Sequence, residues 1–159
     1  MRLPDIPAPP PGRPEEMSGL EHLEAIRDGI LPPPPIAQLL GFDLVELGLG
    51  RATFEVVPGE RHYNPIGVVH GGLAATLLDS AMGCAVQTTL DAGVGYTTLD
   101  LNCTFVRPMT MDTGKVLCEG TVVHKGSRVA TAEARVFSSR TGKLIAHGTC
   151  ACVLLPQES

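Results

Sequence analysis

The chain has 159 residues and a formal net charge of −5, with 12 Lys and Arg against 17 Asp and Glu. This length fits one domain that buries a substantial core without metal or disulfide support. The basic residues are scattered, which argues against nucleic acid as a partner. The 5 cysteines form no CxxC pair and the 5 histidines are dispersed, so we expect reduced core thiols in a cytoplasmic protein and no metal site.

The N-terminal part of the chain divides into two segments that precede the main domain. Residues 1–16, MRLPDIPAPPPGRPEE, lack the continuous apolar core of a secretory signal, and their prolines favour a disordered tail. Residues 17–38 are expected to form a helical segment, because Ser18 and Glu21 make a capping box at the start of an apolar face. The main domain is then expected to occupy residues 39–156.

A long uncharged stretch from about Gly71 to about Leu90 is the candidate for a central helix. Its apolar residues fall on every side, which is typical of a helix that is buried nearly all round. Asp79 and Gln87 lie within the stretch, and a carboxylate at this position would be costly in a bilayer. The sequence therefore predicts no membrane partner, and it requires other elements to cover this helix.

Strand patterns surround this helix in the sequence. They occupy residues 43–57, 96–106, 115–124, 128–138 and 143–155. Short turns join the last three segments, which predicts an antiparallel meander. Along 128–138 a row of alanines alternates with larger side chains, and such small residues let a sheet approach a helix closely. The predicted fold is α+β, with a long central hydrophobic helix wrapped by a curved antiparallel sheet.

The segment NPIGVVHGG, from Asn64 to Gly72, is followed along the helix by Asp79. This combination resembles the signature of hotdog-fold acyl-CoA thioesterases, specifically the PaaI-like branch associated with phenylacetic acid degradation. The resemblance implies that residues 39–156 form a hotdog domain that hydrolyses acyl-CoA to a free acid and coenzyme A. Coenzyme A is then part of the substrate, and no separate cofactor is expected. The resemblance also implies a homo-oligomer, either a dimer or a dimer of dimers.

The resemblance further implies roles for individual residues. By position, Gly71 gives its backbone N–H to the thioester carbonyl, and Asp79 activates water or attacks directly. Asn64 and His70 would position the acyl group or the water. A supporting hydroxyl comes from the following strand, where Thr98 is the expected residue.

A basic turn is the candidate contact for coenzyme A. In the family, the corresponding basic or glycine-containing turn approaches the nucleotide or the pantetheine arm, which here implies Lys125, Gly126, Ser127 and Arg128. The alternative is a solvated turn whose charges only favour solubility. Arg107 is a further candidate with less support.

The spacing of Gly71 and Asp79 has a physical consequence that does not depend on the family. The first N–H groups of a helix lack internal partners and lie at the positive end of its dipole, so they suit an oxygen that becomes negative. Asp79 lies about 12 Å further along the axis, whereas both groups must lie near 3 Å from one reacting centre. If both act on one thioester, the acid must come from a second subunit, and a twofold dimer is the simplest arrangement.

Asp79 must be ionised to act as a base or nucleophile, yet its apolar neighbours disfavour the charged form. A hydroxyl or amide donor would counter this, which is the role expected of Thr98 and also of Asn64 from the facing subunit. Thr97 is the alternative hydroxyl, because the strand register is uncertain. Other interpretations remain open: Asp79 as a polar interface residue, His70 as a helix cap and Asn64 as a turn former.

Two other functions are compatible with a hotdog fold. Hydratases and dehydratases that act on acyl-CoA have a histidine shortly after the Asn-Pro pair, but here Gly67 follows Asn64-Pro65-Ile66, so that histidine is absent. A non-catalytic acyl-CoA-binding protein has no need of a desolvated carboxylate such as Asp79. Hydrolysis of the thioester is therefore the function that the sequence favours.

Overall fold

The computed structural model describes residues 16–155, so the expected disordered tail lies outside the described residues except for Glu16. The elements follow the order α1 (Gly19–Arg27), α2 (Pro35–Leu40), β1 (Phe42–Gly48), β2 (Arg51–Val56), α3 (Gly71–Gln87), β3 (Gly95–Phe105), β4 (Val116–Lys125), β5 (Val129–Ser138) and β6 (Leu144–Leu155). Short 3₁₀ turns lie at Glu60–His62 and Met111–Thr113. Among these residues, no helix is long and apolar enough to cross a bilayer.

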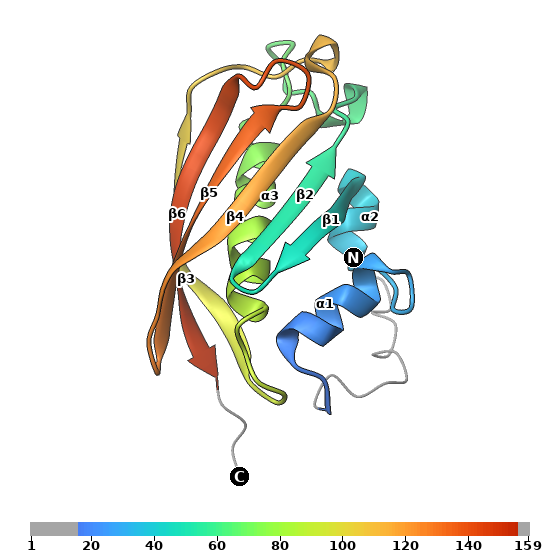
Figure 1. Cartoon of the computed structure of the whole chain (residues 1–159). Coiled ribbons are helices and arrows are strands. Elements are labelled where there is room, and N and C mark those ends of the chain that lie inside the picture. Colours follow the sequence, from blue (N-terminus) through green and yellow to red (C-terminus); the bar gives the residue numbers. More distant parts are fainter. Residues whose placement is uncertain (1–15, 156–159) are drawn as a thin grey trace, which may run out of the picture.

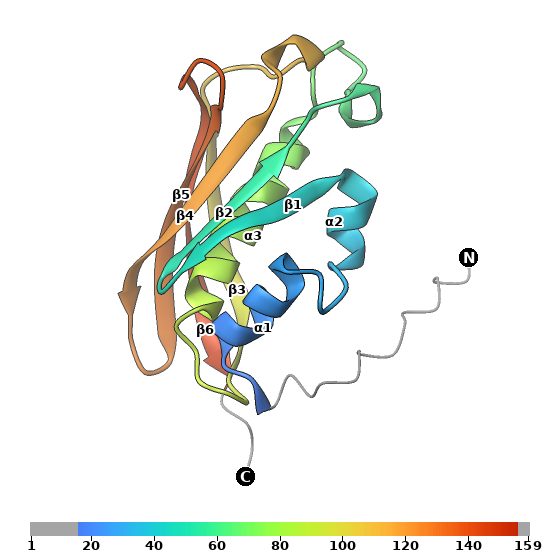
Figure 2. The ribbon, with the colours of Figure 1, turned by 45° about the vertical axis from the view of Figure 1, so that its right-hand side comes forward.

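The six strands form one antiparallel sheet in the order β1-β2-β4-β5-β6-β3. The sheet curves around α3, which lies along its concave face (Figures 1 and 2). Strands β4, β5 and β6 make the expected meander. The sheet stays open, with β1 and β3 as its two edges. These features confirm the expected fold, a long central helix wrapped by a curved antiparallel sheet.

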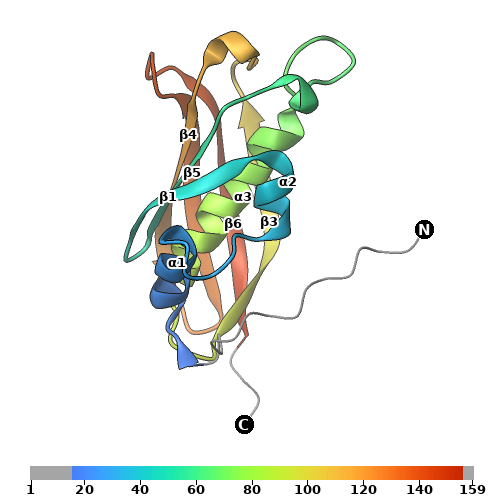
Figure 3. The same ribbon diagram turned by 90° about the vertical axis from the view of Figure 1, so that its right-hand side faces the viewer.

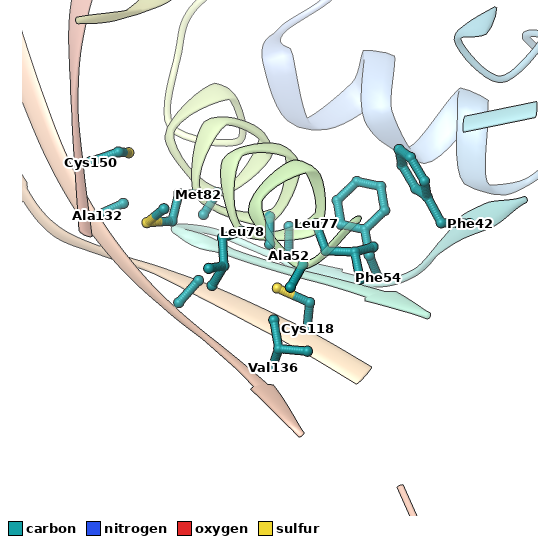
Figure 4. Packing of buried hydrophobic residues seen from close by; sticks show 14 of the residues in the cluster. Phe42, Ala52, Phe54, Leu77, Leu78, Met82, Cys118, Ala132, Val136 and Cys150 are labelled. Atoms are coloured by element: carbon teal, nitrogen blue, oxygen red, sulfur yellow. The ribbon is translucent and has the colours of Figure 1, made fainter. Parts of the chain in front are cut away.

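The core lies between α3 and the concave face of the sheet. Leu77, Leu78 and Met82 of α3 have no exposed surface. Figure 4 shows them among Cys118 and Val136, which come from the sheet. Because α3 is surrounded by apolar side chains along most of its length, its position relative to the strands is fixed by packing.

The helix approaches the sheet most closely over a row of small residues. Gly120, Ala134 and Gly148 are register partners on β4, β5 and β6. A Cβ atom at Gly120 would lie only 2.3 Å from the backbone oxygen of Ala81 in α3. The expected alternation in β5 is confirmed, because its alanines are buried against the helix. Glycine at position 120 is thus required by the close approach of the helix backbone.

One face of α3 is not covered by the sheet. Along this face the side chains are half-buried or exposed and are small or polar, and we call them the open stripe: Gly72, Ala75, Thr76, Asp79, Ser80, Cys84 and Gln87. Their spacing of three or four residues places them on one side of the helix. The burial that the sequence predicts for this helix therefore holds for the other faces of α3. On the open stripe, the carboxylate of Asp79 is only half-buried and can be reached from outside.

Helix α1 lies beside β1 and next to α3, and α2 lies beside β1 (Figures 2 and 3). The expected capping box starts α1, since Ser18 Oγ accepts from the Glu21 N–H at 3.3 Å and Glu21 Oε2 accepts from the Ser18 N–H at 2.8 Å. The Gly19 N–H donates to the Leu90 carbonyl at 2.9 Å. This bond fixes the start of α1 against the C-terminal end of α3.

Candidate active site

The backbone N–H of Gly71, at the N-terminus of α3, has no acceptor among the described residues. His70 is the N-cap, and its Nδ1 accepts a hydrogen bond from the Gly72 N–H at 2.8 Å, while its carbonyl accepts from the Leu73 N–H at 3.0 Å. Within residues 16–155 no group accepts from the Gly71 N–H. Since this N–H lies at the positive end of the helix dipole, it is available to a negatively charged oxygen of a bound molecule.

His70 therefore has a defined structural role. An Nδ1 that accepts from a backbone N–H belongs to a neutral ring that carries its proton on Nε2. The side chain is exposed, so Nε2 can donate to a ligand. The structure thus makes His70 a helix cap, and it leaves the opposite edge of the ring free for positioning.

The loop before α3 is organised by Asn64. Its Oδ1 accepts from the Ile66 N–H at 3.1 Å and from the Val68 N–H at 3.3 Å. Gly67 adopts φ +85°, a conformation that side chains rarely allow, at the tip of this turn. The Asn64 oxygen is thus occupied by its own loop. Its amide group has no acceptor among the described residues, so two N–H donors remain for a ligand.

Asn64 and Gly71 meet in a cleft of about 270 Å³. Its other walls include Phe105, the last residue of β3, and Arg107 and Met109 from the segment that follows. The Arg107 side chain donates to the Leu144 carbonyl at 2.6 Å, which ties this segment to β6. The structure therefore brings together the loop, the free N–H and one basic side chain at one end of α3.

Asp79 lies further along α3, on the open stripe, and is held by a threonine of the same chain. The Thr98 hydroxyl donates to Asp79 Oδ1 at 2.9 Å. Thr97 is exposed on the other side of the strand. The hydroxyl donor expected for this carboxylate is thus supplied within one chain, and the choice between the two threonines falls on Thr98.

Asp79 adds negative charge to a pocket of thiols. Burial raises the pKa of Cys84 to about 12, and the nearby carboxylate of Asp79 adds to this effect. Burial also raises the pKa of Cys150 to about 12, and Cys103 is shifted in the same direction for the same two reasons. These thiols stay protonated at neutral pH, so none of them is an activated nucleophile.

Asn64 and Gly71 lie apart from the pair of Asp79 and Thr98, and the basic turn after β4 lies apart from Gly71. Gly71 and Asp79 are eight residues apart on one helix, or about 12 Å. The turn after β4 lies at the opposite end of α3 from Gly71, since Lys125 Nζ donates to the Thr89 carbonyl at 2.7 Å. Lys125 thus stabilises the C-terminal end of the helix, while Ser127 and Arg128 are exposed. In the described part of the chain, no group of three or more His, Cys, Asp or Glu side chains could hold a metal ion.

The sequence did not single out Tyr96, which lies beside the carboxylate. Its hydroxyl packs against α3 where Gly83 leaves room, because a Cβ atom at Gly83 would lie 2.7 Å from the Tyr96 oxygen. Gly83 is one helical turn beyond Asp79. Tyr96 precedes Thr98 by two residues in β3, so strand alternation places both on the α3 side. That alternation is the signal that could have identified Tyr96.

Comparisons with known proteins place this geometry in context. The family model described as thioesterase superfamily matches residues 66–145. Acyl-coenzyme A thioesterase 13 of Homo sapiens is 33% identical over 105 residues, which cover 66% of this chain and 74% of the relative. A phenylacetic acid degradation-related protein of Ralstonia eutropha has a TM-score of 0.73 and 28% identity, and the match covers 82% of this chain and 98% of that one. The PaaI protein of Escherichia coli shares the fold, with a TM-score of 0.73 and 19% identity over 86% of this chain and 96% of its own.

Proposed function

The chain belongs to the thioesterase superfamily and has the hotdog fold, and from this premise we propose that it hydrolyses acyl-CoA to a free acid and coenzyme A. The observation that carries the proposal is the combination of a free N–H at Gly71 with a carboxylate, Asp79, that accepts a hydrogen bond from Thr98. The first group suits a developing oxyanion, and the second suits activation of the attacking water.

The thioester carbonyl is proposed to bind at the N-terminus of α3. Its oxygen would accept from the Gly71 N–H, where the helix dipole favours negative charge. The absence of a side chain at this position lets the substrate approach the backbone. The amide of Asn64 and the Nε2–H of His70 are the neighbouring donors, and neither has an acceptor within residues 16–155, so both can orient the bound group or the water.

Asp79 is proposed to act on the carbonyl carbon in one of two ways. As a general base it takes a proton from water, and the hydroxide attacks the carbonyl carbon. The C–S bond then breaks, and the thiolate of coenzyme A recovers the proton. As a nucleophile, Asp79 would attack the carbonyl carbon and form an acyl anhydride as the C–S bond breaks and the coenzyme A thiolate leaves; water then hydrolyses the anhydride to the free acid and restores the carboxylate. In both cases Thr98 donates a hydrogen bond to the carboxylate, and the three nearby thiols of Cys84, Cys103 and Cys150 play no covalent part.

The distance between Gly71 and Asp79 supports a site shared by two subunits. We propose a twofold dimer, in which the Gly71 of one protomer and the Asp79 of its partner act on the same thioester. The edge strand β3 has no strand on its outer side among residues 16–155, and its Leu99 and Phe105 side chains are more than half exposed. An open edge with apolar side chains is a surface that a second copy could cover. Pairing of such dimers into tetramers is a further possibility within the same proposal.

Coenzyme A is proposed to contact the turn after β4. In a twofold dimer with antiparallel α3 helices, the C-terminal end of one α3 faces the same side as the N-terminal end of the other. Arg128 is exposed there and free to pair with a phosphate. Lys125 already donates to the Thr89 carbonyl, so Arg128 is the better candidate for this contact. The five free cysteines are compatible with the reducing cytoplasm, which we propose as the compartment.

The proposal is tested by release of free thiol from a panel of acyl-CoA thioesters. A thioesterase liberates coenzyme A, a hydratase gives a hydrated or dehydrated acyl-CoA, and a binding protein gives neither. In the Asp79→Asn variant, which keeps the size of the side chain, we expect turnover to be lost while the protein stays folded. A folded Asp79→Asn protein with unchanged turnover would contradict the proposed mechanism.

A further inference from the structure

His62 is a buried histidine that the proposed mechanism does not use. It ends the 3₁₀ turn at Glu60–His62, and only 5% of its surface is exposed. Its Nδ1 accepts from the Gly59 N–H at 3.0 Å, so the ring is neutral and carries its proton on Nε2. Nε2 then donates to the Leu40 carbonyl at 2.7 Å. Both ring nitrogens are therefore bonded, one within its own turn and one to a distant part of the chain.

The Leu40 carbonyl ends α2, where the last carbonyl groups have no partner within the helix. Arg61 also approaches this carbonyl, with a guanidinium nitrogen at 3.4 Å. Arg61 Nε lies 3.1 Å from His62 Nε2, but both nitrogens are donors in this tautomer, so that contact is not a hydrogen bond. The His62 ring thus makes the shorter of the two bonds that attach its turn to the end of α2.

The backbone of His62 continues this connection towards the candidate site. The His62 carbonyl accepts from the His70 N–H at 2.7 Å. This bond belongs to an antiparallel pairing of residues 62–64 with residues 68–70, which we call the ribbon. Across the ribbon, the backbone N–H of Asn64 donates to the opposite segment at 2.8 Å. The His62 ring therefore anchors the base of the ribbon, and Asn64 lies at its tip.

The Gly71 N–H is oriented from two sides. It belongs to the peptide unit that joins His70 to Gly71, and the carbonyl of this unit accepts from the Leu73 N–H at 3.0 Å on the helix side. On the other side, the His70 N–H is held by the His62 carbonyl. A change at His62 can therefore alter the direction of the Gly71 N–H while α3 stays intact.

We infer that His62 is a positioning residue of the proposed reaction, which fixes the direction of the Gly71 N–H and the place of the Asn64 amide through the ribbon and its bond to α2. The inference rests on the proposed function, because both groups act there on the thioester or the water. His62 is not part of the cleft in which Asn64 and Gly71 meet, so it acts through the backbone and touches no substrate. Misplacement of a catalytic group by about 1 Å can cost about 100-fold in rate.

Three substitutions at His62 separate the bond to Leu40 from the bond to Gly59. In His62→Gln the amide reaches about as far as Nε2 and keeps a donor for the Leu40 carbonyl. In His62→Asn the shorter amide reaches only as far as Nδ1 and keeps an acceptor for the Gly59 N–H. His62→Phe keeps the bulk of a ring and loses both bonds. In the thiol-release assay we expect kcat to stay within about threefold of wild type for His62→Gln and to fall by about tenfold or more for the other two, with little change in KM.

The control for a general loss of stability is Leu23→Ala. Leu23 is buried in α1, which is bonded through the Gly19 N–H to the C-terminal end of α3, whereas the ribbon precedes the N-terminal end. Removal of this core side chain should lower Tm but leave kcat unchanged at a temperature at which the protein is folded. If all three His62 variants keep the kcat of Leu23→Ala, or if His62→Gln loses as much as His62→Phe, the inference is wrong while the proposed function stands.

Hydrogen exchange of the His70 N–H gives a readout that needs no turnover. This N–H exchanges when the base of the ribbon opens locally, so we expect exchange about tenfold or more faster in His62→Asn than in His62→Gln, and the wild-type rate in Leu23→Ala. If the wild type cleaves no acyl-CoA, the proposed function fails, and hydrogen exchange alone then decides whether His62 holds the ribbon. Equal exchange rates in His62→Asn and His62→Gln would contradict that role.

Discussion

Replacing Gly71 by proline removes one N–H group and little else. Gly71 is the first residue of α3, the position at which proline is best tolerated, because its N–H has no partner within the helix. His70, the preceding residue, has φ −60° and ψ 132°, which is the conformation that a following proline requires. A Cβ atom at position 71 would meet Phe105 at 3.4 Å, an ordinary contact distance. The substitution therefore tests the oxyanion donor without breaking the helix.

The expected effect follows from the chemistry of such donors. Loss of one oxyanion-hole hydrogen bond costs roughly 100- to 1000-fold in kcat, equivalent to about 2.7–4 kcal/mol. The matched control is Gly71→Ala, which adds the Cβ atom but keeps the N–H. We expect Gly71→Ala to lose part of the activity, because its Cβ atom hinders the approach of the substrate to the backbone. The kcat of Gly71→Pro in the thiol-release assay should be lower than that of Gly71→Ala by this further factor. A folded Gly71→Pro protein with the kcat of Gly71→Ala would refute the role of this N–H.

Four further changes test other parts of the account. Thr98→Val should lower kcat/KM roughly ten- to a hundredfold, because Asp79 loses its hydrogen bond from the threonine hydroxyl, whereas Thr98→Ser keeps the hydroxyl and should retain activity. Arg128→Glu should raise KM for acyl-CoA with little change in kcat, and an unchanged KM would remove the phosphate contact. Gly120→Ala should lower Tm by several degrees, because the added Cβ atom overlaps the α3 backbone and overpacking costs about 1–3 kcal/mol. Burial lowers the pKa of His22, so the unfolded chain binds a proton more readily, and the free energy of unfolding falls as the pH drops below about 6.5. His22→Gln should therefore lose less Tm on acidification than the wild type. An equal loss in the two proteins would exclude His22 as the cause.

Features that depend on neighbouring residues could be predicted from the sequence. The capping box of Ser18 and Glu21 is local, since both partners lie within one helical turn. The alternation in β5 is also local, and its alanines indicated the side that meets the helix. The free N–H of Gly71 follows from its place after a capping histidine, which the sequence already positions. The fold class and the free N–H of Gly71 rest on signals of this kind, whereas the role of Asp79 came from the family resemblance.

Features that depend on register or on distant contacts could not be predicted. Thr98 was expected from the family resemblance, but strand alternation alone does not lead to it. A bulge interrupts the pairing of β3 and β6 between Thr98 and Asp100, so alternation counted back from Cys103 leads to Thr97, whereas the structure turns Thr98 towards α3. The open stripe was also hidden, because alanine, serine and cysteine side chains suit either a buried or an exposed position. The bond from Lys125 to the helix end joins residues 36 apart, and no local pattern indicates it.

The central claim is that two protomers share one site, and subunit mixing tests it most directly. Asp79→Asn and Gly71→Pro are each expected to be inactive alone. After unfolding and refolding of an equal mixture, half of the dimers should be mixed, and each mixed dimer has one site with both groups intact, so activity should return to about a quarter of wild type. If native mass spectrometry shows mixed dimers and activity stays at the level of the parent variants, the shared site is contradicted.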